Sequence, residues 1–278
     1  MNIILTGSHG YLGTNLKDFL ANKGYQILIL DRFICDKTKD LIRFSNFEDD
    51  IRDYDAPCAI IHCAGLYEIK DITVLELAQA NLFYSINVLE KAIVAKIPYF
   101  VNINTALPEE LNFYALSKRQ FSEWGKRESL LGKITFIDLH LEHFYGMGVG
   151  NNNFVRYLLD AMIRNVPELK LTKGEQQRDF IYITDVLNAI DVVVKNLRNF
   201  NSYSKVPVGS GESISIKQLV KLLQDLSHTT TFCNFGAINY RNNEVMNSKA
   251  DISLLTKLGW QPTVDIETGL SRMLEEYK

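Results

Sequence analysis

The sequence predicts an α/β protein with a doubly wound parallel sheet and a smaller α/β second lobe. Short apolar runs alternate with amphipathic stretches of helical length, the pattern of buried parallel strands joined by helices. In addition, three glycines follow the first apolar run directly and lead into a helix, as in many nucleotide-binding α/β folds. The five runs expected to form strands are 3–5, 27–30, 59–61, 100–103 and 134–139.

Helices are expected between these runs, where apolar residues recur at helical spacing, as in 71–95 and 112–127. After about Gly150 the chain becomes richer in Asn, Gly and short elements, and helices are expected at 154–164, 184–196 and 216–227. No repeat, low-complexity tract or long linker interrupts the chain. We therefore expect one domain over 1–149 and a second lobe over 150–278 that sends segments back to the first.

Composition excludes several classes of function. The chain has 278 residues, 46% hydrophobic and 23% charged, with a formal net charge of -3 and no basic stripe, so a nucleic-acid partner is not expected. No apolar run approaches the ~20 residues of a membrane span, and the N-terminus lacks a signal-peptide pattern, which favours the cytoplasm. The 4 cysteines are irregularly spaced and form no CxxC, so neither disulfides nor a metal site are expected.

The strongest local motif is "LTGSHGYLGTNL", which begins at the end of the first predicted strand. Gly7, Gly10 and Gly13 have the GxxGxxG spacing and lie between a strand and a helix, where glycines let the backbone close around a pyrophosphate. Tyr11 and Leu12, at the start of that helix, are expected to contact the same ligand. The motif therefore predicts a dinucleotide site in a Rossmann-type domain, and the alternative is a tight turn without a ligand.

Residues at the ends of the next strands extend this predicted site. Asp31 can accept hydrogen bonds from a ribose 2′-hydroxyl, which favours NAD(H), whereas Arg32 can pair with the 2′-phosphate of NADP(H), so the choice of cofactor stays open. Asp31 can also serve as a turn cap. The pair Asp50 and Ile51, and the segment "HCAG" ending at Gly65, fall at the same sheet edge.

Tyr114 and Lys118 lie four positions apart in "NFYALSKRQF" and so share one helix face. An ammonium beside a phenol favours the phenolate, so we expect Lys118 to lower the pKa of Tyr114. Such a spacing is common on exposed helices, but here Thr105 ends the fourth strand nearby. Its hydroxyl could share a substrate oxygen with the phenol, which favours proton-transfer chemistry.

Together these motifs resemble the extended short-chain dehydrogenase/reductases of the nucleotide-sugar epimerase/dehydratase family, over nearly the whole chain. The resemblance implies that Thr105, Tyr114 and Lys118 are the catalytic Ser/Thr, Tyr and Lys. It also implies cofactor contacts for the glycine motif and for Asp31, Asp50, Ile51, Ala64, Gly65 and Asn81, the last as a support for the nicotinamide side of the sheet edge.

The second lobe resembles the same family in three places. "KGEQQRDFIYITDV" carries Arg178 and "NYRNNEVMNSKADISLLTKLGWQP" carries Arg241, which the resemblance assigns to the diphosphate of a sugar nucleotide. Guanidinium groups pair bidentately with phosphates, although surface salt bridges are the ordinary alternative. Asn153 matches an Asn near the sugar nucleotide, and simple helix capping explains it equally well.

Departures from the family pattern narrow the chemistry. Ala106 and Leu107 follow Thr105 where dehydratases resemble one another in carrying Asp-Glu, and Ala106 also replaces the Cys of certain keto-sugar epimerase/reductases. Glu142 and His143 interrupt the usual Arg-x-x-Asn-x-Tyr-Gly-Pro. Ala106 and Leu107 disfavour dehydration, and Ala106 disfavours epimerisation beside a ketone. Glu142 and His143 are expected to reshape the sugar pocket.

The chain looks most like 4-ketoreductases of the CDP-abequose synthase kind, which act in O-antigen synthesis. We therefore expect NAD(P)H-dependent reduction of a nucleotide-linked 4-keto-6-deoxyhexose at C4. The alternatives are a 4-epimerase with tightly bound NAD and a catalytically idle nucleotide-sensing module. The resemblance also implies a homodimer that pairs helices 71–95 and 112–127 across a two-fold axis.

Overall fold

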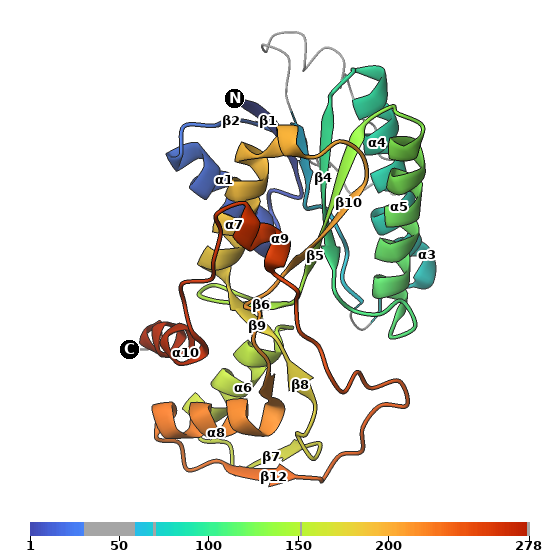
Figure 1. The fold of residues 1–278 in the computed structure, drawn as a ribbon. Helices are drawn as coiled ribbons and strands as arrows, with labels where there is room; N and C mark the ends of the chain where they lie inside the picture. Colours follow the sequence, from blue (N-terminus) through green and yellow to red (C-terminus); the bar gives the residue numbers. More distant parts are fainter. Residues whose placement is uncertain (31–58, 69–70, 151, 277–278) are drawn as a thin grey trace, which may run out of the picture. The chain divides into compact units, whose positions relative to one another are not determined.

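The computed structural model describes residues 1–30, 59–68, 71–150 and 152–276 (Figure 1). The chain divides into two compact units, Met1–His140 with Val193–Val206, and Leu141–Val192 with Pro207–Lys278. The sequence placed its boundary at 149/150. The predicted cofactor residues Asp31, Arg32, Asp50 and Ile51 lie outside the described residues.

A six-stranded sheet in the order β10-β5-β4-β3-β1-β2 forms the centre of the first unit (Figure 1). The pairs β1–β2, β1–β3 and β3–β4 are parallel. The chain goes from β1 to β2 on one side and then returns to β3 on the other, so the doubly wound prediction is confirmed. The strands are β1 Asn2–Thr6, β2 Gln26–Ile29, β3 Ala59–His62, β4 Tyr99–Thr105, β5 Thr135–Leu141 and β10 Ser204–Val208.

All five predicted strands are present in this sheet, and β10 is its one strand that was not predicted. Its sequence, SKVPV, includes a charged residue and Pro207, which lacks a backbone N–H and is tolerated mainly at sheet edges. Only alternate residues of this strand, Val206 and Val208, are buried. A short edge strand of this kind has no continuous apolar run to reveal it.

Helices cover both faces of this sheet, with α1 on one side and α4 and α5 on the other (Figure 1). Between the sheet and α5, Phe100 and Phe136 stack with ring centroids 5.3 Å apart, and Phe121 packs edge-on against both. Gly125 of α5 is required here because a Cβ would overlap the Phe136 ring. The bounds are α1 Tyr11–Asn22, α3 Val74–Ala78, η1 Gln79–Phe83, α4 Tyr84–Val94, α5 Phe113–Leu130 and η2 Leu197–Asn199.

The predicted helix 71–95 is therefore α3 and α4 joined by η1, a stretch of π-helix. A π turn inside an α-helix is rare and often marks a functional site. Here it contains Asn81, one of the residues that the sequence assigned to the cofactor site.

The second unit contains three two-stranded sheets and most of the remaining helices. Strands β6 and β9 are parallel, as are β7 and β12, whereas β8 and β11 are antiparallel. The helices expected at 154–164, 184–196 and 216–227 are all present, within a residue at each end. The bounds are β6 His143–Tyr145, α6 Phe154–Ile163, β7 Glu168–Leu171, β8 Gln177–Arg178, β9 Phe180–Tyr182, α7 Ile183–Lys195, β11 Ile214–Ser215, α8 Ile216–Ser227, β12 Phe232–Phe235, α9 Ser253–Lys257 and α10 Ile266–Glu275.

Two buried carboxylates hold distant segments of the second unit together. Asp179 accepts hydrogen bonds from the backbone of Ser210 and Ala250, at 2.7 and 3.1 Å. Asp185 accepts from the backbone of Thr263 and Val264 at 3.0 and 2.9 Å. These acidic residues, which belong to the motif "RDFIYITD", therefore have a structural role.

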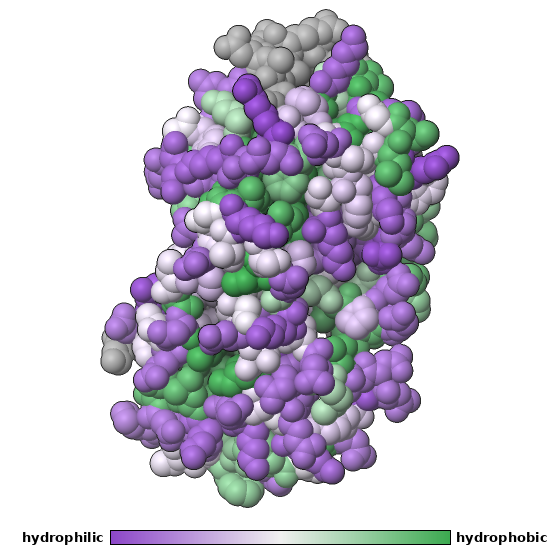
Figure 2. Space-filling model, in the orientation of Figure 1, coloured by the Kyte–Doolittle hydropathy of each residue, from purple (hydrophilic) through white to green (hydrophobic). Residues whose placement is uncertain are grey.

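None of the helices in the described parts of the chain is long and apolar enough to cross a membrane. Figure 2 shows the surface of one face of the molecule, on which polar and apolar residues are interspersed.

Candidate active site

The glycine motif forms a close turn between β1 and α1. Gly7 has a φ of +72°, and a Cβ at this position would lie 2.5 Å from the backbone nitrogen of Ala64. A Cβ on Gly13 would overlap the carbonyl oxygen of Gly7. Gly10 is the N-cap of α1, and no side chain caps this helix end and no acidic residue lies in its first turn. A helix N-terminus without a capping side chain or a nearby acidic residue fits the pyrophosphate of a dinucleotide.

A chain of buried hydrogen bonds fixes the strand ends next to this turn. The Thr6 hydroxyl lies 2.8 Å from Nδ1 of His62, and Nε2 of His62 lies 2.8 Å from the Ser85 hydroxyl. The backbone N–H of Ala64 donates to Thr6 at 3.3 Å. Burial, and secondarily the charge of Lys118, hold the pKa of His62 well below its usual value, so this ring is neutral. The sequence analysis did not identify His62, because its role depends on residues distant in sequence.

Asn81 is fully buried and bonds to the loop that follows β3. Its Oδ1 accepts from the Leu66 backbone N–H at 2.6 Å, and its Nδ2 donates to the Leu66 carbonyl at 2.9 Å and to the Ser117 hydroxyl at 3.0 Å. The π turn thus places Asn81 against α5, one residue from Lys118. Its amide is occupied by protein partners, so we expect it to support the cofactor through this loop.

Lys118 is 3% exposed, and among the described residues its ammonium makes no hydrogen bond or ion pair. Its Nζ lies 4.0 Å from where a Cβ on Gly65 would be. Burial lowers the pKa of Lys118 to about 8, against the opposing charges of Asp138 and Cys63. A buried cation without protein partners, next to the loop after β3, fits the hydroxyl groups of a cofactor ribose.

Tyr114 is half-buried on the same helix, and its ring stacks on Tyr67 with centroids 4.5 Å apart. Burial raises the pKa of Tyr114 above its ordinary value, and Tyr67 adds to the effect. The pKa is therefore not lowered as the sequence predicted, because burial removes the phenolate from water. The phenol is consequently neutral over the physiological pH range, which is the form that donates a proton.

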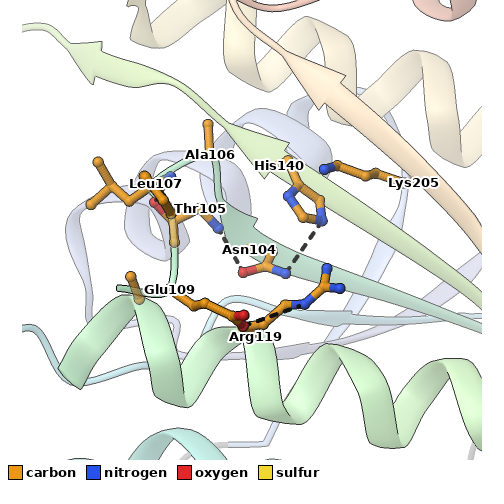
Figure 3. Close-up of a pocket in the computed structure, with 10 residues that line it drawn as sticks. Asn104, Thr105, Ala106, Leu107, Glu109, Arg119, His140 and Lys205 are labelled. Carbon is orange, nitrogen blue, oxygen red and sulfur yellow. Dashed lines mark hydrogen bonds and ion pairs between the residues drawn. The ribbon is translucent and has the colours of Figure 1, made fainter. Parts of the chain in front are cut away.

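Thr105 ends β4 and lines a pocket of about 190 Å³ within the first unit (Figure 3). Asn104, Arg119, His140 and Lys205 form its polar wall. The Thr105 hydroxyl oxygen accepts from the Leu107 backbone N–H at 3.2 Å, which leaves the hydroxyl hydrogen available to a ligand.

The three predicted catalytic residues thus lie at the end of β4 and in the first two turns of α5. No hydrogen bond among the described residues joins their side chains directly. The shared contact of Thr105 and Tyr114 with one substrate oxygen stays a prediction.

The predicted substrate-binding residues Asn153, Arg178 and Arg241 all belong to the second unit. Asn153 caps α6, since its side chain accepts from the backbone of Val155 and Arg156 at 3.0 and 3.3 Å. Asn153 therefore acts as a helix cap, and its contact with substrate stays a prediction.

Arg178 is not a surface residue, since it is 8% exposed and its guanidinium pairs with Glu244 at 2.5 Å. Arg241 is exposed, and its carbonyl accepts from the backbone N–H of Glu244 at 3.1 Å. The turn that carries Arg241 therefore also supplies the carboxylate that neutralises Arg178.

Glu142 and His143, the departures noted in the sequence, lie at the start of the second unit. Glu142 is buried, and its carboxylate accepts a shared hydrogen bond from the Ser248 hydroxyl, which lies 2.7 Å from Oε1 and 2.6 Å from Oε2. No cluster of three His, Cys, Asp or Glu side chains in the described residues could hold a metal ion.

The doubly wound sheet, the glycine turn and the Tyr-x-x-x-Lys pair on α5 define a class, the Rossmann-type dinucleotide-binding enzymes. Residues 3–209 match the model of the NAD dependent epimerase/dehydratase family, and the chain belongs to that family. The family resemblance identified from the sequence is confirmed. The family's description also agrees with the predicted nicotinamide cofactor.

Individual relatives agree with this assignment. The chain is 31% identical to a CDP-abequose synthase of Salmonella muenchen, over 98% of this chain and 96% of the relative. It is 29% identical to a CDP-abequose synthase of Salmonella typhimurium, over 98% and 97% of the two chains. Its fold is similar to the structure of UDP-glucuronic acid 4-epimerase from Bacillus cereus in complex with UDP-glucuronic acid and NAD, with a TM-score of 0.84, 20% identity and 99% and 98% of the two chains covered.

Proposed function

We propose that this protein reduces the 4-keto group of a nucleotide-linked 6-deoxyhexose with NADH or NADPH. The observation that carries the proposal is the match to two CDP-abequose synthases over nearly the full length of each chain. The pattern of the site supports it, because Thr105, Tyr114 and Lys118 match the family's catalytic Ser/Thr, Tyr and Lys, whereas Ala106 and Leu107 supply no acid or base. A role in deoxysugar and O-antigen synthesis in the cytoplasm follows from the same proposal.

The first unit holds the dinucleotide in this proposal. The turn of Gly7, Gly10 and Gly13 and the first residues of α1, Tyr11 and Leu12, would bind its pyrophosphate. Ala64 and Gly65 would contact the adenosine, and Lys118 the ribose on the nicotinamide side. The cofactor supplies the hydride that reduces C4 of the sugar.

The residues of this chain supply the proton and the orientation. Tyr114 donates its phenolic proton to the oxygen at C4 as negative charge develops there, and Thr105 hydrogen-bonds the same oxygen. The ammonium of Lys118 stabilises the phenolate that remains after the proton has left, so its effect on the phenol is larger in the transition state than in the resting protein. The raised pKa of Tyr114 in the resting state is compatible with this role.

In the second unit, Arg178 and Arg241 would bind the diphosphate of the sugar nucleotide. Glu244 already satisfies the guanidinium of Arg178, so binding requires the phosphate to share or replace this carboxylate. A buried guanidinium needs a counter-charge, and Glu244 supplies it in the resting protein.

We also propose a homodimer formed through α4 and α5. Val94 and Trp124, on these two helices, expose 68% and 54% of their surfaces, and Phe83, just before α4, exposes 60%. Large exposed apolar side chains on adjacent helices are typical of an interface.

The function can be tested with purified protein, reduced cofactor and CDP-linked 4-keto-6-deoxyglucose, by following cofactor oxidation together with the sugar product. Tyr114→Phe is the matched control, because it removes the donated proton and keeps the ring against Tyr67. Turnover by the wild type that falls about 10²- to 10⁴-fold in the variant supports the proposal. Interconversion of nucleotide sugars on tightly retained NAD, without consumption of added cofactor, would instead identify a 4-epimerase.

A further inference from the structure

The end of β4, where the proposed catalytic Thr105 lies, is connected to a buried carboxylate on the neighbouring strand. Asp138 of β5 is 0% exposed and lies at the centre of a polar cluster inside the first unit. Nδ2 of Asn102 donates to it at 2.7 Å, Nδ2 of Asn104 at 3.0 Å and the Ser122 hydroxyl at 2.5 Å. His140 lies 2.7 Å away through Nε2.

This carboxylate is ionised. Burial by itself would raise the pKa of Asp138, but the hydrogen bonds from His140, Ser122 and Asn102 lower it below its ordinary value. A buried anion that accepts several hydrogen bonds fixes the geometry of its donors, because turning any one donor away leaves part of the charge unsatisfied.

Asn104 is the donor that leads to the proposed site. Its Nδ2 is held by Asp138. Its Oδ1 accepts from the backbone N–H of Thr105 at 2.8 Å (Figure 3). The side chain is 4% exposed, so water does not compete for these bonds. Asn104 thereby fixes the backbone N–H of Thr105.

The other side of Thr105 is fixed by its own hydroxyl, which accepts from the backbone N–H of Leu107. The two contacts together orient the Cα–Cβ bond of Thr105 and leave only its hydroxyl hydrogen free. A hydroxyl that is held in this way needs little reorganisation when it donates to a developing negative charge.

We propose that Asp138 and Asn104 are positioning residues that hold the hydroxyl of Thr105 in its reactive orientation. This inference rests on the proposed function, since it assigns the network to the same reaction. Neither residue contacts the substrate in the proposal, and both act through Thr105.

Asn102 provides a matched control. It lies two residues earlier on the same strand and is likewise buried, and it donates to the same carboxylate at 2.7 Å. No hydrogen bond in the described residues connects Asn102 to Thr105. Asn102→Ala and Asn104→Ala therefore each remove one amide that donates to Asp138. Asn104→Ala also removes the contact with Nε2 of His140 and the acceptor for the Thr105 N–H.

The experiment compares kcat, KM and the free energy of unfolding for the wild type and both variants. We expect Asn104→Ala to lower kcat about ten- to a hundredfold, as misplacing a reactive group typically does, with KM for sugar nucleotide and cofactor nearly unchanged. Asn102→Ala should keep kcat within about threefold of the wild type. Equal losses of kcat in the two variants, or a normal kcat in Asn104→Ala, would overturn the inference.

A second measurement does not depend on activity. Hydrogen exchange of the Thr105 amide, followed by NMR, should be protected in the wild type and in Asn102→Ala and faster in Asn104→Ala. If the wild type reduces no sugar nucleotide, the proposed function fails while this exchange pattern still tests the network. Unchanged protection of the Thr105 amide in Asn104→Ala would contradict the proposed network. If Asn104→Ala does not fold, Asn104→Ser replaces it, because a serine side chain is too short to reach both Asp138 and the Thr105 N–H.

Discussion

Replacing Lys118 with methionine should make the protein more stable and less active. The ammonium is 3% exposed and has no hydrogen-bonding partner among the described residues, so the charges of Asp138 and Cys63 offset only part of the hydration that it loses on folding. Methionine has a similar length and no charge. Function and stability are therefore in conflict at this position.

The size of the effect follows from the pKa. A fall from 10.5 to about 8 means that folding disfavours the charged form by about 3 kcal/mol, and this penalty is fully present below pH 8. Between pH 8 and 10.5 the folded protein binds fewer protons than the unfolded chain, so the penalty is relieved as the pH rises. We expect the free energy of unfolding of Lys118→Met to be about 1–3 kcal/mol higher than that of the wild type at pH 7. This difference should vanish above about pH 10.5.

The assay is urea unfolding of both proteins without cofactor, followed by tryptophan fluorescence at several values between pH 7 and 10.5. The difference between the two proteins isolates Lys118, because the other titrating groups are common to both. A variant that is less stable than the wild type at pH 7, or a difference that does not change with pH, would show that the charge of Lys118 does not destabilise the fold.

The remaining predictions concern the reaction, the substrate and the assembly. Arg241→Ala should raise KM for the sugar nucleotide about ten- to a few hundredfold with cofactor affinity unchanged, because the guanidinium contacts a part of the substrate remote from C4; an unchanged KM would show that Arg241 does not bind the diphosphate. Arg178→Ala should raise KM similarly and also destabilise the fold, since it leaves the carboxylate of Glu244 without its partner, and urea unfolding measures the second effect. Gly13→Ala should abolish cofactor binding by calorimetry, because its Cβ would overlap the Gly7 carbonyl, and normal binding would contradict the glycine-turn assignment. Sedimentation at micromolar concentration should show a dimer that Trp124→Glu converts to a monomer, and a monomeric wild type would rule the dimer out.

The strands and helices that the sequence predicted are those with a strong periodic signal. The apolar runs 3–5 of β1 and 59–61 of β3 are buried throughout, so their composition alone identifies them. Strand β10 was not predicted because Lys205 and Pro207 interrupt its apolar residues. The π turn at Asn81 was not predicted because its sequence has the same periodicity as the α-helix on either side of it.

The candidate site was predicted where residues close in sequence act together, as in the glycine turn and the pair Tyr114 and Lys118. It was not predicted where the partners are distant. Asp138 and its donor Asn102 are 36 positions apart, and the pKa of Tyr114 depends on burial and on Tyr67. No local pattern records such contacts, so neither the network behind Thr105 nor the direction of that pKa could be read from the sequence.

The most direct test of the proposed reduction is the fate of the hydride. Enzyme freed of bound nucleotide is mixed with cofactor that carries deuterium at the transferable position of the nicotinamide, together with CDP-linked 4-keto-6-deoxyglucose, and the product is analysed by NMR. We expect one deuterium at C4 for each cofactor oxidised, and loss of this transfer in Tyr114→Phe. A product without deuterium at C4, formed while the added cofactor remains reduced, would contradict it.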